Sequence, residues 1–332
     1  MKSLRMLPFL LLGSLGAHAA SISGTLYYTT YSGGTNVHSV DYSYNGSALS
    51  LTNNIGIAAT TGADGLLFAP DGNLVVAGQS NNVLSEITKT GSLVNMVGAG
   101  TGSYHLALSS NAPNATLYNL WNGSGSGGTT SISATTLSSG GLASGGIAYT
   151  VNCSGSCSTD VRGLVYDPVN NTWYYGTAAD GQSGSFGTVS FDNTSHVATL
   201  TQLMTNVYAH GLTYDPFTQD IIMSSANTIQ QYSAALNSIV STANGPGNFD
   251  QSAVDGQGHL FVASNSGNLQ FIDYAASGLI GSSTYSTSPF LAGSLDDIAP
   301  LSGTGSNPVP EPGMLSLFGA GLLAMGMRRR KN

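Results

Sequence analysis

A unit that returns along the chain constrains the fold more than any other feature of the sequence. Its clearest copies begin at Asp64, Arg162 and His210, and looser copies begin at His105 and Asp250. Successive copies therefore start 41, 57, 48 and 40 residues apart. Each contains short apolar segments separated by turn residues, and four strands in about 40–50 residues is the period of a β-propeller blade.

The apolar segments inside the repeat predict the strands. Glycine is abundant, at 44 residues, and only 7% of the chain is charged, which favours short strands and turns over helices. Second strands are expected at Leu74–Ala77, Leu117–Trp121, Trp173–Gly176, Ile221–Ser224 and Leu260–Ala263, third strands at Val83–Thr88, Thr188–Asp192 and Leu269–Tyr274, and fourth strands at Leu93–Val97 and Ala198–Met204.

The two ends of the repeat region complement each other. Gly24–Thr30, Val37–Tyr42 and Ala48–Leu51 match strands two, three and four, with no first strand before them. The missing strand occurs at the other end, at Asp296–Leu301. One blade built from both termini closes a ring and removes exposed sheet edges. The predicted fold is therefore an all-β, six-bladed β-propeller closed by its N- and C-terminal strands.

The chain begins with the features of an export signal. Lys2 and Arg5 precede the apolar run Met6–Leu15, and Ala17-His18-Ala19 forms a small-residue cleavage site. This pattern predicts cleavage after Ala19 by signal peptidase, following passage through the export translocon. The expected domains are a signal peptide at 1–19, the propeller at 20–303 and a C-terminal tail at 304–332.

The C-terminal tail combines a short Pro-Glu-Pro signature, an apolar segment and a basic end. Met314–Met327 spans roughly 21 Å as a helix, so with its flanks it predicts a short, marginal transmembrane helix. The cations after it favour a cytoplasmic C-terminus. The tail is either a lasting inner-membrane anchor or a transient one removed by processing. The signature residues are Pro310, Glu311, Pro312, Arg328, Arg329, Arg330 and Lys331.

This tail resembles the PEP-CTERM sorting signal of exopolysaccharide-producing Gram-negative bacteria. The resemblance implies recognition by exosortase, with processing near the Pro-Glu-Pro signature, and delivery to the cell surface or extracellular matrix. The body resembles the broad NHL/SMP-30/virginiamycin-lyase-like propeller group through Gly-Leu-x-Tyr-Asp-Pro and Asp-Gly-Gln-Gly-His-Leu-Phe-Val-Ala. These body motifs are made of strand and turn residues, so they support the fold and not an activity.

The body is strongly acidic. Residues 21–307 contain Lys89 and Arg162 as their only basic residues against fifteen acidic ones, a net charge of −13 with neutral histidines. Nucleic acids and anionic membrane surfaces are therefore excluded as favourable partners.

One position in the repeat is ionisable in every copy. It lies just before the innermost strand, and its register could shift by one residue between Asp296 and Asp297 and between Asp250 and Gln251. A channel-mouth ligand site is the functional interpretation, while ordinary polar lining of a propeller channel is the structural alternative. The candidate ligand-binding residues are Asp64, His105, Arg162, His210, Asp250 and Asp296.

Within this set, Arg162 and the two histidines would face an anionic group. Asp64, Asp250 and Asp296 are metal candidates, because carboxylates suit Ca²⁺ or Mg²⁺.

Several other residues are assigned structural roles. Cys153 and Cys157 predict a disulfide in an exported protein, closing a short loop at a gain of roughly 2 kcal/mol. Turns are predicted where Asp precedes Pro or Gly at Asp167, Asp215 and Asp255. His38, His196 and His259 are read as isolated surface or turn residues.

The sequence favours a non-catalytic binding protein of the cell surface or matrix, with exopolysaccharide or another surface glycan as its partner. One alternative is a metal-assisted lyase or lactonase-type hydrolase acting at the channel mouth. Another is a purely structural matrix protein without a ligand. No catalytic residue is assigned, and no Gly-x-Ser-x-Gly, His-Glu-x-x-His or Walker sequence occurs.

Overall fold

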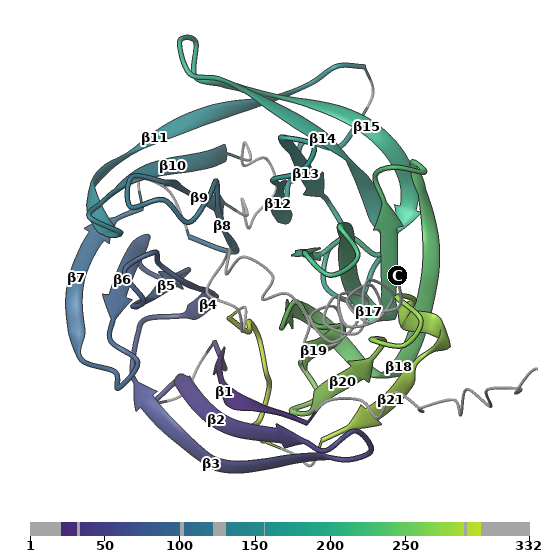
Figure 1. The fold of residues 1–332 in the computed structure, drawn as a ribbon. Helices are drawn as coiled ribbons and strands as arrows, with labels where there is room; N and C mark the ends of the chain where they lie inside the picture. The colour runs from purple at the N-terminus through teal and green to yellow at the C-terminus, as the bar shows by residue number, and fades with distance from the viewer. Residues whose placement is uncertain are drawn as a thin grey trace, which may run out of the picture.

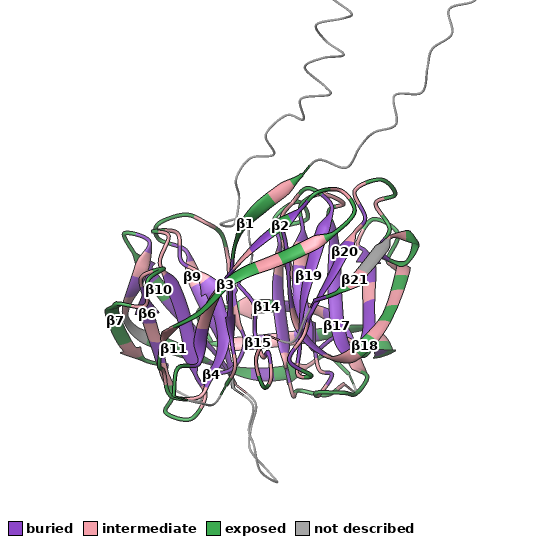
Figure 2. Cartoon of the chain, turned by 90° about the horizontal axis from the view of Figure 1, so that it is seen from below, coloured by how far each residue is buried: buried purple, intermediate pink, exposed green. Residues whose placement is uncertain are grey.

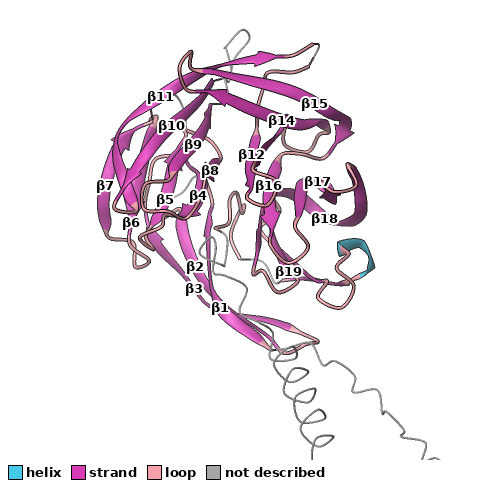
Figure 3. Cartoon of the chain, turned by 45° about the horizontal axis from the view of Figure 1, so that its top comes forward, coloured by secondary structure: helices cyan, strands magenta, loops and turns pink. Residues whose placement is uncertain are grey.

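The computed structural model describes residues 21–31, 34–99, 103–121, 131–155, 157–288 and 291–299. These residues form β-strands and one short 3₁₀ helix, η1 (Ile280–Ser282), shown in cyan in Figure 3. Over these ranges no helix has the length and apolar character needed to cross a membrane. The predicted signal peptide and the predicted transmembrane tail lie outside the described residues.

Two of the sheets are simple antiparallel meanders. Neighbouring strands in each are consecutive in the chain, as a period of four short strands predicts. The first sheet holds β1 (Ile22–Thr29), β2 (Val37–Tyr44) and β3 (Leu49–Ala58), and the second holds β4 (Ala63–Phe68), β5 (Leu74–Gly78), β6 (Val83–Ile87) and β7 (Leu93–Gly98).

A third sheet of eight strands joins two further meanders. Their outer strands pair in parallel, giving the order β12-β13-β14-β15-β11-β10-β9-β8. Its strands are β8 (Leu106–Leu108), β9 (Thr116–Trp121), β10 (Ser131–Ser138), β11 (Gly141–Cys153), β12 (Gly163–Asp167), β13 (Thr172–Gly176), β14 (Gly184–Asp192) and β15 (Val197–Val207).

The fourth sheet contains two long strands that each serve two partners. β17 pairs first with β16 and then, from Ala226, with β18, while β18 pairs with β19 from Phe249 onward. Its strands are β16 (Gly211–Asp215), β17 (Asp220–Ser233), β18 (Ser238–Val254), β19 (His259–Ser264), β20 (Leu269–Asp273) and β21 (Thr284–Thr287).

The sheets are arranged around a common axis, as in a β-propeller. Figure 1 shows β4, β8 and β12 near the centre of the ring and β7, β11 and β15 at its rim. Buried residues concentrate on the inner strands, whereas β3 and the first part of β18 carry exposed ones (Figure 2). Adjacent sheets pack face to face, for example through Tyr42, Phe261 and Phe271. This packing hides the apolar faces of the sheets from water.

The last described segment pairs with the first strand. Ile298 forms an antiparallel bridge with Tyr28, and the amide of Ala299 donates to the carbonyl of Tyr27 at 2.9 Å. Leu295, Ile298 and Ala299 are buried there. The segment from 291 to 299 therefore supplies the axial partner of β1, which the N-terminal sheet lacks. We call residues 291–299 the closing segment.

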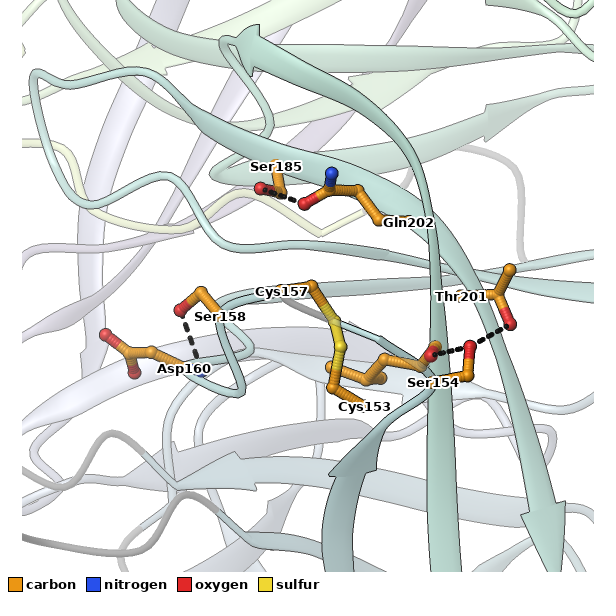
Figure 4. The surroundings of a disulfide bond; sticks show 9 residues. Cys153, Ser154, Cys157, Ser158, Asp160, Ser185, Thr201 and Gln202 are labelled. Atoms are coloured by element: carbon orange, nitrogen blue, oxygen red, sulfur yellow. Dashed lines mark hydrogen bonds between the residues drawn. A yellow bond between two sulfur atoms is a disulfide. The ribbon is translucent and has the colours of Figure 1, made fainter.

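A disulfide between Cys153 and Cys157 lies where β11 meets β15. The amide of Ser154 donates to the carbonyl of Leu200 at 2.9 Å, and its hydroxyl contacts that of Thr201 (Figure 4). These contacts hold the chain just after β11 against β15, and the disulfide closes the short loop that contains Ser154.

The interpretation of His259 as an isolated residue is wrong. Its ring is buried, with Nδ1 2.6 Å from Asp255 Oδ2 and Nε2 3.8 Å from Asp273 Oδ1. Asp273 also accepts a hydrogen bond from the hydroxyl of Tyr44 on β2 at 2.8 Å. The repeat alone did not show that the N-terminal sheet would bring Tyr44 against this pair.

Candidate functional site

Four of the six predicted ligand-binding residues are buried and lie together at the axis. Asp64 is on β4, Asp250 is on β18, and His105 and His210 directly precede β8 and β16. Each residue occupies the same place in its repeat, so the ring of strands brings together residues that are far apart in the sequence.

His105 is the centre of the cluster. Its Nε2 lies 3.3 Å from Asp250 Oδ1, 3.4 Å from Asp297 Oδ1 and 3.8 Å from Asp64 Oδ1. Its Nδ1 contacts the carbonyl oxygen of Arg162 at 2.8 Å. A carbonyl oxygen can only accept, so Nδ1 carries the hydrogen, and in the neutral ring the Nε2 lone pair faces the carboxylates.

His210 is held in the same way. Its Nδ1 donates to the carbonyl oxygen of Ala178 at 2.8 Å. Its Nε2 lies 2.7 Å from Asp180 Oδ1, 3.1 Å from Asp250 Oδ1 and 3.2 Å from the hydroxyl of Tyr104. The Asp180 side chain is 54% exposed, so this contact connects the buried cluster with solvent.

Several atoms of the cluster are buried without a hydrogen-bond partner. They are His105 Nε2, Asp296 Oδ2, Asp297 Oδ1 and Asp250 Oδ1, of which Asp250 Oδ1 has an ion-pair contact with His210 Nε2 at 3.1 Å. The two His105 contacts near 3.3 Å therefore lack hydrogen-bond geometry, although the atoms face one another. Burying polar groups without partners is costly, so four such atoms at one place need a physical explanation.

The last repeat contributes two acids instead of one. Asp297 joins His105 and Asp64, and its Oδ2 accepts the amide of Leu66 at 3.0 Å. Asp296, the predicted metal candidate, is in neither of the groups that could hold an ion, although its amide bonds to the carbonyl of Thr29 at 2.9 Å. Because Asp296 and Asp297 are adjacent, the repeat left open which of them joins the cluster, and only the side-chain positions distinguish them.

Arg162 lies beside the cluster, with its guanidinium paired to an acid outside the predicted set. Its guanidinium pairs with Asp160, at 2.7 Å from Nη2 and 3.1 Å from Nε. Burial opposes its charge, but Asp160 keeps the pKa of Arg162 above its ordinary value. The residue reaches the cluster through its backbone carbonyl, which orients His105.

All the carboxyls of the cluster except that of Asp250 resist ionisation. Burial, followed by the charges of neighbouring aspartates, raises the pKa of Asp64 and of Asp297 well above the ordinary value. Burial and Asp250 do the same to the pKa of Asp296. Burial would also raise the pKa of Asp250, but His210 and His105 hold it below its ordinary value.

The two imidazoles differ. Burial lowers the pKa of His105, with Asp250 opposing this shift. Burial would likewise lower the pKa of His210, but Asp250 and Asp180 raise it well above its ordinary value. In the absence of another cation, His210 is therefore the positive partner of Asp250.

The cluster fits a divalent cation. Two overlapping groups have ligand atoms within 4.8 Å of one another: Asp64, His105 and Asp297, and His105, His210 and Asp250. Ligand atoms around one Mg²⁺ or Ca²⁺ lie about 3–3.5 Å apart, close to the separations around His105 Nε2. A metal-bound histidine typically donates its other nitrogen to a carbonyl or carboxylate, as both histidines do here.

Sequence reasoning missed Tyr104, Asp180 and the joint contribution of Asp297. Tyr104 directly precedes His105 and stacks on its ring, with centroids 4.2 Å apart. Asp180 lies in the turn between β13 and β14, where the repeat carries no constant residue. The adjacent acids at 296 and 297 were the one available signal.

The C-terminal tail matches a known sorting signal. Residues 308–331 match the family model described as the PEP-CTERM protein-sorting motif. This match implies that the protein is exported, that its tail anchors it transiently in the membrane and that exosortase processes it. No curated protein matches the sequence.

Solved structures resemble the body. The periplasmic gluconolactonase of Pseudomonas aeruginosa is 13% identical, with 84% of this chain and 98% of that chain aligned and a TM-score of 0.52. Virginiamycin B lyase from Staphylococcus aureus is 10% identical over 81% of this chain and 89% of that chain, with a TM-score of 0.47. At this identity the gluconolactonase likeness shows the fold alone, and it agrees with the propeller-like body that the repeat predicts.

Proposed function

We propose that this chain is an exported surface protein whose propeller holds one divalent cation at its axis and uses it in a lactonase- or lyase-type reaction. The observation that carries the proposal is the set of unpartnered buried atoms converging on His105 Nε2. A cation between these atoms would satisfy them, and a lactonase or lyase role gives that cation a chemical task, which the metal-free binding role favoured by the sequence does not.

The repeat and the strand pairing support six blades. β17 and β18 each change partner midway, so each counts as two strand segments. The six labelled strands of the fourth sheet therefore make two groups of four segments. The eight-stranded sheet divides likewise at the parallel β11–β15 pairing. With the β4–β7 sheet, and with β1–β3 joined by the closing segment, this gives six. The propeller would then occupy 20–303, between a signal peptide at 1–19 and a sorting tail at 304–332.

The ligands proposed for the cation are His105, Asp64, Asp250 and Asp297. Three carboxylates and one imidazole form an oxygen-rich set, which suits Ca²⁺, Mg²⁺ or Mn²⁺. His210 is left for another task, because Asp180 and Tyr104 already occupy its Nε2. When bound, the cation would supply a Lewis acid that polarises a carbonyl oxygen.

Asp180 and His210 are placed to move a proton. Asp180 reaches solvent and contacts His210 Nε2 at 2.7 Å, while the ring is fixed from behind by Ala178. Burial, and then the neighbouring aspartates, raise the pKa of Tyr104 well above its ordinary value, so its hydroxyl remains a donor beside His210. A base at the mouth beside a polarising cation suits hydrolysis of a lactone or elimination next to a carbonyl.

Calorimetric titration of chelator-treated protein with Ca²⁺, Mg²⁺ and Mn²⁺ tests the cation. We expect a single ion to bind, and Asp250→Asn to weaken binding by on the order of 100-fold or more, since even outer-shell changes cost 10–100-fold. Asp192→Asn is the matched control, because Asp192 is the exposed last residue of β14 and belongs to neither group that could hold an ion. No binding of any of the three ions would contradict the proposal.

A panel of sugar lactones tests the reaction. Asp180→Asn should lower turnover by roughly 10²–10⁴-fold, the contribution of a general base, without changing cation affinity. Turnover equal to that of the wild type would show that Asp180 is not the general base.

A further inference from the structure

The closing segment is the most weakly paired axial element among the described residues. Its bridge between Tyr28 and Ile298 is an isolated one. By contrast, the axial strands β4, β8 and β16 pair with their neighbours at four, three and five residues. Around the bridge, the amide of Thr29 donates to the carbonyl of Asp297, and the amide of Asp296 donates to the carbonyl of Thr29.

The same short segment carries buried carboxyl groups without partners. Asp296 Oδ2 and Asp297 Oδ1 are both buried without a hydrogen-bond partner. Two further carboxyls face them, Asp64 from β4 and Asp250 from β18, so carboxyls from three different elements meet here. These oxygens converge across the place where the ring is held by the fewest backbone bonds.

We propose that the cation is the latch of the ring: it joins the closing segment to β4 and β18 and so holds the two ends of the body together. This inference rests on the proposed cation site. Asp297 is the residue that couples the two, because its carboxylate is a proposed ligand while its backbone carbonyl accepts the amide of Thr29.

The latch acts locally. Leu295, Ile298 and Ala299 are buried in the two apolar clusters on either side of β1, and this burial keeps the segment in place without an ion. Loss of the cation should therefore raise the frequency with which the closing segment opens and should leave the rest of the ring folded. Local opening of this kind is measured by amide hydrogen exchange.

Hydrogen exchange of the signal-cleaved protein with its tail tests the latch, with Ca²⁺, Mg²⁺ or Mn²⁺ compared with a chelator. The bound ion should slow exchange of the amides of Thr29, Asp296 and Ala299 by at least about tenfold. The amides of β16, which pair with β17 away from the closing segment, should exchange at an unchanged rate.

Asp297→Asn provides a second test at the residue that couples the ligand set to the closing segment. The asparagine oxygen can still accept the amide of Leu66, so the closing segment should stay in place in chelator. It should lose most of its response to the ion. Asp192→Asn, the same change at the exposed end of β14, should behave as the wild type.

Two results would overturn the inference, and they are distinguishable. If calorimetry shows an ion bound but exchange of the closing segment is unchanged, the cation site stands and the latch is wrong. If no ion binds, the proposed function fails and the latch fails with it.

Discussion

At the scale of residues, the fixed orientation of the two histidine rings defines the site. Both rings donate Nδ1–H to backbone carbonyls, of Arg162 and Ala178, and therefore turn Nε2 toward carboxylates. In His210 this creates a charged pair with Asp250, whereas His105 faces acceptors without hydrogen-bond geometry. The protein thus fixes the orientation of both rings before any ligand arrives, which lowers the cost of binding.

The stability of the chelated protein should fall as pH rises. Asp64, Asp296 and Asp297 have raised pKa values, so the folded protein keeps protons that the unfolded chain releases from about pH 4 upward. Stability is therefore lost from that pH through their folded pKa values. The raised pKa of His210 acts in the same direction, because its contribution is lost as pH passes its folded pKa. The lowered pKa of His105 acts in the opposite direction, because the folded protein loses the proton of this ring at a lower pH than the unfolded chain does.

Thermal unfolding in chelator at pH 5 and pH 8 checks the sign. The Tm should be lower at pH 8 by at least about 3 °C, since 1 kcal/mol shifts the Tm of a chain of this size by roughly 2–4 °C. The depressed pKa of Asp250 reverses the trend only in stronger acid, below its ordinary value. A Tm that rises from pH 5 to pH 8 would show that the cluster is not the buried acid group described here.

At the scale of elements, the sequence predicted strands better than it predicted their connections. The segments expected at Leu74–Ala77, Trp173–Gly176 and Leu260–Ala263 all lie within observed strands. Apolar runs between turn residues carry that information locally. The parallel β11–β15 pairing and the partner changes of β17 and β18 depend on where whole sheets meet, which no local pattern records.

The same distinction applies to the site. Repeat register alone identified Asp64, His105, His210 and Asp250, because equivalent positions must face the axis. It could not show that Asp160 would take the guanidinium of Arg162, since the path of the chain before β12 decides that contact.

Removal of the disulfide should have a modest and local effect. Changing both Cys153 and Cys157 to Ser removes the constraint on a loop of five residues, worth about 2 kcal/mol in loop entropy. Denaturant unfolding should show a loss of that size, and exchange at the amide of Ser154 should increase. Wild-type protein treated with reductant is the control. Collapse of the whole ring in either sample would mean that the β11–β15 junction is essential to folding.

At the scale of the whole molecule, the ring is complete before the sorting tail begins. The closing segment ends at residue 299, and the matched sorting motif begins at residue 308. The body is acidic while the tail holds Arg328, Arg329, Arg330 and Lys331. Removal of the tail would therefore leave a strongly acidic domain, which favours solubility outside the cell.

Processing of the tail is directly measurable. Mass spectrometry of the protein recovered from the surface of cells with exosortase should show a C-terminus near Pro310-Glu311-Pro312. The same protein from cells without the enzyme should retain Arg328–Lys331. An intact basic end in both samples would mean that the tail is a lasting anchor.

The central claim is that one divalent cation lies at the axis, held by His105, Asp64, Asp250 and Asp297. Anomalous diffraction from a crystal grown with Mn²⁺ locates the ion without reference to activity. We predict a single strong peak among His105 Nε2, Asp250 Oδ1 and Asp297 Oδ1. Diffraction that shows these side chains ordered but no peak between them, or a peak only among exposed carboxylates, would contradict it.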